Sequence, residues 1–203
     1  MTEIPDSPTT PALPLARTSA ATDTALVATF AAFIAVCAIL PAIPTGTAVP
    51  ITLQTFAVAL CGLVLGARRG LLAVLLYLAV GFAGLPVFSG GTGGLGVLTR
   101  ASAGYLVAFP FAAALAGLLA SRTVNLRPRV RYWALMGAAT AGSLLVIHPL
   151  GIAGLAWRLG LSAGEAIAAG AVFLPGDVAK NLLAALVASA IFRAFPDLLR
   201  GRR

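Results

Sequence analysis

The chain has 203 residues, of which 60% are hydrophobic and only 10% are charged, and its formal net charge is +8. Because a soluble domain has about 25% charged residues, this composition leaves too little polar surface for a water-facing protein and indicates an all-α integral membrane protein. The positive charge would suit phosphate groups. However, the arginines lie mainly at the edges of apolar runs, so we expect a lipid bilayer and no nucleic acid as the partner.

Residues 1–23 are rich in Pro, Thr and Ser and lack the charged start and apolar core of a signal peptide, which predicts a flexible cytoplasmic tail. Residues 24–195 are predicted to form the transmembrane domain and residues 196–203 a basic cytoplasmic tail. Six segments of the domain approach the about 20 apolar residues that a spanning helix needs. They are Thr24–Ile43, Ile51–Gly66, Gly70–Leu85, Gly104–Ala120, Tyr132–Leu150 and Gly176–Phe195. The second and third are short and nearly continuous, so we expect a tight helical hairpin.

Most arginines fall in segments that would lie on one side of such a bundle. They are Arg17, Arg68, Arg69, Arg122, Arg127, Arg129, Arg131, Arg193, Arg200, Arg202 and Arg203. The opposite side has only Arg100 and Arg158, with Lys180 near the start of the last span. Because short loops rich in Lys and Arg stay in the cytoplasm, we predict that both termini are cytoplasmic and that the protein lies in the cell membrane.

Three segments remain for the outer side, Pro44–Pro50, Pro86–Ala103 and Gly151–Pro175, and all are rich in Gly, Pro and apolar residues. Irregular backbone near membrane depth is tolerated only where it is buried in protein or lines a cavity. We therefore expect these segments to fold over a site. Within the third, Ser162 and Glu165 fit a capping box, which predicts a short helix to about Val172.

The segment Gly91–Gly96 matches the pattern GxGxxG, but it lies between two predicted spans, and the next acidic residue is Glu165. A dinucleotide site needs a strand before the glycines, a helix after them and an acid about 20 residues on. We therefore expect no nucleotide cofactor here. The backbone of Gly90, Gly91 and Gly94 can instead approach a ligand closely, although a tightly packed loop is the alternative.

The one histidine, His148, raises the alternative of an intramembrane Ser–His hydrolase using Ser102 or Ser143. Neither serine lies in a GxSG-like nucleophile turn, so we expect no enzyme activity. Cys37 and Cys61 lie in apolar runs without CxxC spacing, which favours two buried thiols over a disulfide or a metal site.

The segment FLPGDVAKNLLAAL places Asp177 and Lys180, the only lysine, in an otherwise apolar run. Their i, i+3 spacing puts both side chains on one helix face. Ionisable residues inside a membrane protein are costly and functional by default, although a structural ion pair is the alternative. With Gln54, Tyr105 and Arg100, they predict a pocket for a small amphiphilic ligand with an amide-like polar head.

Five motifs in order give the chain a recognisable pattern. They are Pro50–Phe56 (PITLQTF), Gly66–Gly70 (GARRG), Gly84–Gly91 (GLPVFSGG), Ala103–Tyr105 (AGY) and Phe173–Lys180 (FLPGDVAK). The chain resembles the BioY family, the biotin-binding S components of energy-coupling factor vitamin transporters. The resemblance implies a bundle of six transmembrane helices with cytoplasmic termini, biotin as the transported ligand and no cofactor. It also implies a transmembrane coupling protein and two ATPase subunits as partners.

The resemblance implies that Asp177 and Lys180 bind the ureido ring of biotin, with Phe88, Val87 and Leu95 as apolar walls. Asn181 and the glycines of the 90–94 loop complete the implied set. The family usually reads GPTGGY where this chain has RASAGY, so Arg100 either binds the valerate carboxylate or caps the loop in water. An S component for a different small vitamin is the alternative function.

S components also tend to use an Ala-xxx-Ala pattern in their first helix against the coupling protein. Two overlapping pairs fit, Ala28 with Ala32 and Ala31 with Ala35. Small residues at this spacing allow helices to approach closely, while ordinary packing of an Ala-rich helix is the alternative.

Overall fold

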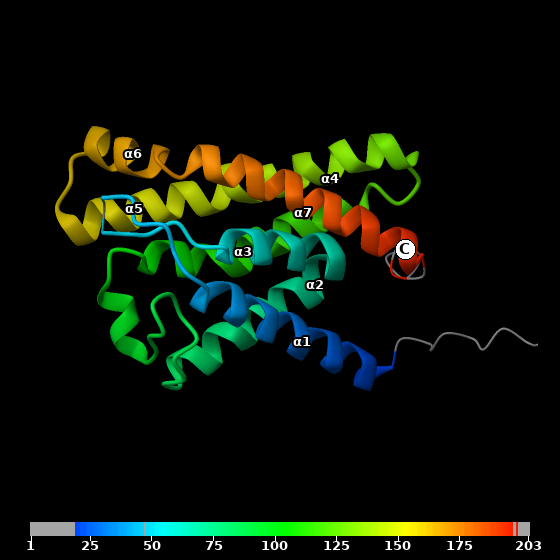
Figure 1. Ribbon diagram of the computed structural model, residues 1–203, viewed down its shortest axis with the longest axis horizontal. Helices are drawn as coiled ribbons and strands as arrows, with labels where there is room; N and C mark the ends of the chain where they lie inside the picture. Colours follow the sequence, from blue (N-terminus) through cyan, green and yellow to red (C-terminus); the bar gives the residue numbers. More distant parts are fainter. Residues whose placement is uncertain (1–18, 47, 197, 199–203) are drawn as a thin grey trace, which may run out of the picture.

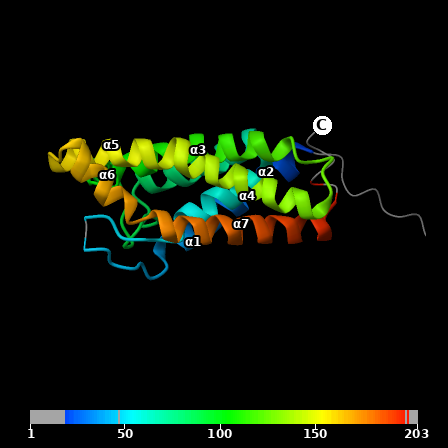
Figure 2. The ribbon, with the colours of Figure 1, turned by 90° about the horizontal axis from the view of Figure 1, so that it is seen from above.

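The computed structural model describes residues 19–46, 48–196 and 198, so most of both predicted tails lies outside the described residues. The described part is an elongated helical bundle (Figures 1 and 2). Its α-helices are α1 (Ala20–Ile39), α2 (Gln54–Phe82), α3 (Ala103–Ser121), α4 (Pro128–Gly142), α5 (His148–Leu159), α6 (Ala163–Ala171) and α7 (Leu174–Ala194). Two short turns join them, the 3₁₀ turn η1 (Leu95–Thr99) and the π-turn η2 (Ser143–Ile147).

Five stretches of helix are long and apolar enough to cross a membrane: α1, α2, α3, α7 and the continuous run Pro128–Leu159. The all-helical membrane fold predicted from composition is therefore confirmed for the described residues, which show only two isolated β-bridges. The count differs from the predicted six because the second and third predicted spans form the single element α2.

Helix α2 is folded back on itself at Gly66, whose φ of 82° and ψ of 179° are not helical. The Gln54 side chain donates to the Tyr77 hydroxyl at 2.7 Å, 23 residues along the chain. In a straight helix these residues would lie about 35 Å apart. The predicted hairpin is therefore present, as two arms of α2 that pack against each other.

Gly66→Ala is expected to destabilise the fold by about 1–3 kcal/mol, because the backbone region that Gly66 occupies is essentially restricted to glycine. A Cβ at this position would meet nothing within 4 Å, so the cost is one of backbone strain. Gly137→Ala in α4 is the matched control, since its Cβ also enters open space but its backbone is helical. Thermal unfolding in detergent measures both. Equal unfolding temperatures for the two variants would show that the bend of α2 at Gly66 does not need a glycine.

The ends of α1 differ from the prediction by four residues each. Residues 20–23 were assigned to the tail but are helical, because the Ser19 hydroxyl caps the helix by accepting from the Thr22 amide at 3.2 Å. The helix ends at Ile39 because Leu40 precedes a proline and adopts an extended backbone, with ψ of 153°.

The predicted end of the fifth span at Leu150 is wrong, since the helical run continues through α5 to Leu159. A proline inside a helix normally clashes with the preceding turn. Here the wider π-turn η2 ends just before Pro149, at the start of α5, and the helix continues past the proline. The run then ends at Gly160, which has a left-handed φ of 64°.

The predicted short helix is confirmed as α6, with Ser162 as its N-cap. The Glu165 carboxylate accepts from the Ser162 hydroxyl at 2.6 Å and from its amide at 2.8 Å. These hydrogen bonds lower the pKa of Glu165. The first part of the third predicted outer segment thus belongs to the fifth span, and the later part forms α6, which packs beside α5 at the left of Figure 1.

Candidate ligand-binding site

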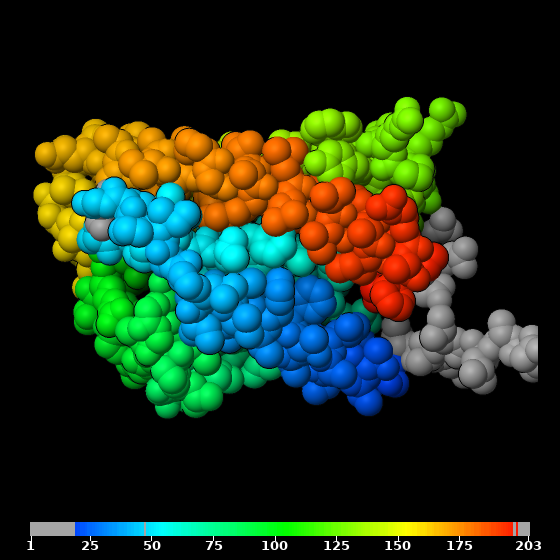
Figure 3. Space-filling view, in the orientation of Figure 1, coloured from blue at the N-terminus to red at the C-terminus, as the bar shows by residue number. Residues whose placement is uncertain are grey.

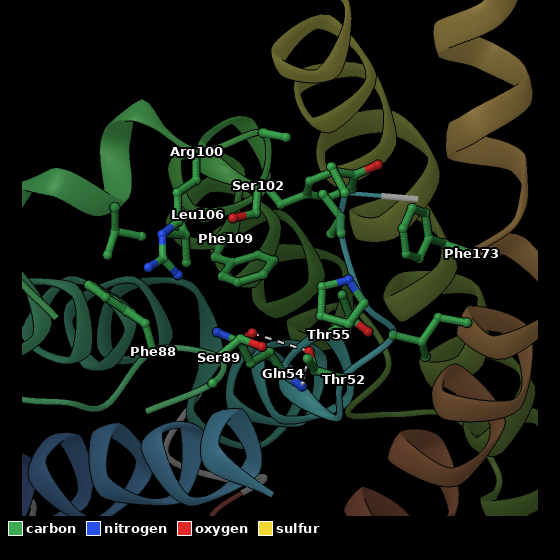
Figure 4. Close-up of a pocket in the computed structure, with 18 of the residues that line it drawn as sticks. Thr52, Gln54, Thr55, Phe88, Ser89, Arg100, Ser102, Leu106, Phe109 and Phe173 are labelled. Carbon is green, nitrogen blue, oxygen red and sulfur yellow. Dashed lines mark hydrogen bonds between the residues drawn. The ribbon is translucent and has the colours of Figure 1, made fainter. Parts of the chain in front are cut away.

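A pocket of about 440 Å³ lies at the end of the bundle where α2, α3 and α7 begin (Figure 4). Its volume is within the about 300–1,000 Å³ usual for small-molecule sites. All three predicted outer segments contribute to it, through residues 48–50, parts of 88–102, and Leu159 with Phe173. Because three helix N-termini meet there, the partial positive charge of their dipoles is directed at this end of the bundle.

The polar floor of the pocket is the carboxylate of Asp177, which is only 4% exposed. Its Oδ1 accepts from the Thr55 hydroxyl at 2.9 Å and from the Lys180 ammonium at 3.1 Å. Its Oδ2 lies 3.1 Å from Nε2 of His148, which is also buried. Lys180 donates a second time, to the Thr55 hydroxyl at 3.0 Å. The carboxylate therefore accepts hydrogen bonds from α2 and α7 and makes a close contact with α5.

The floor of the pocket keeps hydrogen-bonding capacity that a ligand can use. A carboxylate oxygen can accept two hydrogen bonds, and an ammonium can donate three. Oδ1 of Asp177 is filled, whereas Oδ2, which lies beside Nε2 of His148, keeps acceptor capacity for a ligand. Lys180 has one N–H left beyond its bonds to Asp177 and Thr55. The floor thus presents one free acceptor next to one free donor.

Two further polar groups line the pocket above the floor. Gln54 accepts from the Thr52 hydroxyl at 3.1 Å and donates to Tyr77, which holds the amide in place. The Tyr105 hydroxyl is buried and has no hydrogen-bond partner among residues 19–46, 48–196 and 198. A buried hydroxyl without a partner is costly, so Tyr105 is suited to a ligand or a water molecule.

Aromatic side chains form the apolar walls. Phe88 is 1% exposed and packs edge-on against Tyr77, with ring centroids 5.4 Å apart. On the other side of the pocket, Phe173 packs against the Tyr105 ring at 5.6 Å. Figure 4 shows Phe88 and Phe173 on opposite sides of the open space, with Phe109 between them. The walls suit a ligand with an apolar body.

The model of the BioY family matches residues 9–197. The chain belongs to the BioY family. It is 41% identical over 179 residues to the biotin transporter BioY of Rhizobium etli, covering 87% of this chain and 96% of that one. It is 42% identical over 186 residues to the biotin transporter BioY of Rhodobacter capsulatus, with the same coverage.

A solved structure shares the fold of this BioY family member. It is the crystal structure at 2.1 Å of the S-component for biotin from an ECF-type ABC transporter. The TM-score is 0.76 at 26% sequence identity, and the match covers 85% of this chain and 92% of the other. The similarity therefore extends over most of both chains.

Seven residues expected of a BioY site line the pocket. They are Asp177, Lys180, Gln54, Tyr105, Arg100, Phe88 and Gly90. Arg100, labelled in Figure 4, is exposed, and its guanidinium donates to the Thr92 hydroxyl at 3.2 Å. Most of its five N–H donors remain free for a ligand.

Five other expected residues do not line the pocket. Gly91 and Gly94 direct their amides into the fold, to the carbonyls of Phe88 at 3.0 Å and Gly81 at 2.7 Å. Val87 and Leu95 are outside the lining. Asn181 lies one turn below Asp177, where its amide donates to the Ser143 hydroxyl at 3.2 Å and joins α7 to η2.

Three contributors were missed by the sequence reasoning. Thr55 lies next to Gln54 in the PITLQTF motif, so its position at the start of α2 was a usable signal. Phe173 precedes the predicted span by a few residues and was assigned to a loop. The sequence favours His148 as a hydrogen-bonding residue at a helix end over a catalytic base, and nothing in its local sequence places it beside Asp177.

Proposed function

We propose that this chain is the membrane-embedded subunit that captures biotin for uptake, with transport energised by a coupling protein and two ATPase subunits. The observation that carries the proposal is the free acceptor on Asp177 next to the free donor on Lys180. The ureido ring of biotin presents an N–H beside a C=O, which complements this pair. The curated relatives are named as biotin transporters, which supports the same ligand.

The opposite end of biotin is a carboxylate on an apolar chain. The charged residues that line the pocket are Asp177, Lys180 and Arg100, so the lining carries one net positive charge. Biotin carries one negative charge and would make the occupied pocket neutral. We assign the valerate carboxylate to Arg100, and the ring and chain to the walls around Phe88 and Phe173.

Purified protein is expected to bind labelled biotin saturably, and Arg100→Ala to weaken that binding two- to fivefold, because an exposed ion pair contributes about 0.2–1 kcal/mol. Biotin amide, which has no carboxylate charge, should bind wild type and variant equally well. Arg158→Ala is the control, since Arg158 donates to the Leu98 carbonyl instead of lining the pocket. No biotin binding by folded wild type would refute the proposed ligand. An equal loss for biotin and its amide would refute the role of Arg100.

The two alternatives make different demands on the site. A different vitamin with a cyclic amide would also fit Asp177 and Lys180, and competition of unlabelled vitamins against labelled biotin separates these ligands. A Ser–His hydrolase needs a serine hydroxyl beside His148. Instead, His148 contacts Asp177, and the Ser143 hydroxyl is bonded to Asn181. The geometry therefore favours capture over catalysis.

We also propose six membrane spans, with each arm of α2 as one of them and with both termini cytoplasmic. The pocket lies at the end opposite Arg68, Arg69 and the loop of residues 122–127 (Figure 1). Two exposed tryptophans, Trp133 and Trp157, stand at the two ends of the Pro128–Leu159 run. At 1.5 Å per residue they are about 36 Å apart, which suits the two interfaces of a bilayer.

This orientation predicts the labelling of two engineered cysteines in intact cells. Thr99→Cys near the pocket mouth should react with a membrane-impermeant maleimide, whereas Ala194→Cys at the end of α7 should react only after permeabilisation. Both positions are exposed, and the native Cys37 and Cys61 are buried. The reverse pattern would invert the proposed topology.

The outer face of α1 is our proposed contact with the coupling protein. Of the two Ala-xxx-Ala pairs, Ala28 and Ala32 are exposed, whereas Ala31 is buried and Ala35 is half-buried. In Figure 3, α1 forms much of the visible face beside α7. The Ala31–Ala35 pair therefore packs inside this bundle, and Ala28–Ala32 is the pair left for a partner helix.

A further inference from the structure

We propose that His148 is a positioning residue for ligand capture: it holds Oδ2 of Asp177, and the π-turn η2 is the device that brings it there. The inference rests on the proposed function, because it concerns the acid that we assign to the ureido ring. His148 does not line the pocket and lies behind Asp177. Its action on a ligand is therefore indirect.

The π-turn explains how the side chains of both Ser143 and His148 reach α7. The His148 amide donates to the Ser143 carbonyl, five residues back, which is the hydrogen bond of a π-turn. In a regular α-helix, residues five apart would point about 140° away from each other. In the π-turn they face the same way, and both side chains contact α7: Ser143 contacts Asn181, and His148 contacts Asp177.

The partners on α7 are spaced to match. Asp177 and Asn181 are four residues apart and therefore lie on one face of that helix. All four side chains are buried, with exposures of 2% to 5%. Without the extra residue in η2, only one of the two side chains, Ser143 or His148, could reach α7. π-Turns inside α-helices often occur at functional sites, and here the turn serves the pocket.

The chemistry of the contact defines what His148 supplies. An ionised carboxylate can only accept, so the proposal requires that Nε2 of His148, which lies 3.1 Å from Oδ2, carries a proton. Thr55 on α2 and Lys180 on α7 both hold Oδ1, while His148 on α5 holds Oδ2. Removing His148 leaves the carboxylate fixed at one oxygen only. The free acceptor that faces the ligand would then no longer have a fixed direction.

A double-mutant cycle tests this role. His148→Phe keeps an aromatic ring and removes the Nε2 group that faces Oδ2, and it is expected to weaken biotin binding about tenfold, since the proposed interaction is with a charged group and such interactions are among the stronger ones. His148→Gln returns an N–H at a similar reach and should recover most of the affinity. In the Asp177→Asn background, His148→Phe should change affinity less than about twofold, because the group it acts through is gone. Equal, additive losses in both backgrounds would overturn the proposal.

A readout without biotin separates this inference from the proposed ligand. Because the chain has one histidine, ¹⁵N-histidine labelling of tag-free protein gives one pair of imidazole resonances. The Nε2 resonance should be protonated and should shift in Asp177→Asn but not in Ser189→Ala, which alters a buried hydroxyl about 18 Å further along α7. An Nε2 resonance insensitive to Asp177→Asn would overturn the inference. If His148→Phe fails to fold, the biotin affinity of His148→Gln and the imidazole spectrum of the wild type and Asp177→Asn still test whether His148 acts through Asp177.

Discussion

Asp177→Asn is expected to weaken biotin binding about 100-fold, the largest loss of affinity for a single substitution in this pocket. The asparagine side chain keeps one acceptor and replaces the other with an NH₂ group. In one orientation that group would replace Oδ2 and face His148 and the ligand N–H; in the other it would replace Oδ1 and face the donors of Thr55 and Lys180, so a donor meets a donor either way. Losing a hydrogen bond to a charged group and leaving another unmet costs about 3 kcal/mol, which corresponds to the expected factor.

Equilibrium binding of labelled biotin in detergent measures the change. Asp23→Asn is the matched control, because it makes the same chemical change in an acid at the other end of the bundle, where Asp23 pairs with Arg69 at 2.6 Å. The control should bind biotin as wild type does, although it loses an ion pair. If Asp177→Asn bound biotin normally, the acid and Lys180 would be a structural pair only, and the ligand would have to contact other lining residues.

Helix positions and the central ion pair could be predicted from the sequence because the physics behind them is local. Long apolar runs, the i, i+3 spacing of Asp177 and Lys180, and the capping box at Ser162 each depend on residues a few positions apart. The hairpin at Gly66 was predictable for the same reason, since a short basic break separates two apolar runs.

The contacts that the sequence did not reveal are long-range or depend on irregular backbone. His148 is 29 residues before Asp177, and only the π-turn directs it towards that carboxylate. Pro149 suggested a helix end, yet the wide turn just before it let the helix continue to Leu159. Asn181 shares a face with Asp177, but Ser143 occupies its amide, which local spacing cannot show.

The double substitution of Ala28→Trp and Ala32→Trp is expected to abolish biotin uptake by cells and leave biotin binding within about twofold of wild type. Both alanines are on the exposed side of α1, remote from the pocket lining. Overpacking a close helix contact costs about 1–3 kcal/mol at each site. For two sites, this lowers the affinity of the chain for the coupling protein at least tenfold. Uptake of labelled biotin and co-purification of the coupling protein measure the effect.

The control for this variant is Val107→Trp, which adds a tryptophan to an exposed apolar position on α3 and should leave uptake unchanged. The decisive feature is the separation of binding from transport. Under the proposed function, the pocket residues alone hold the ligand, whereas movement across the bilayer is energised by the coupling protein and its ATPases. If the double variant lost binding as well, the alanine face would be structural. If it kept both uptake and co-purification, the coupling protein would have to bind a different surface, and the exposed side of α1 would face lipid.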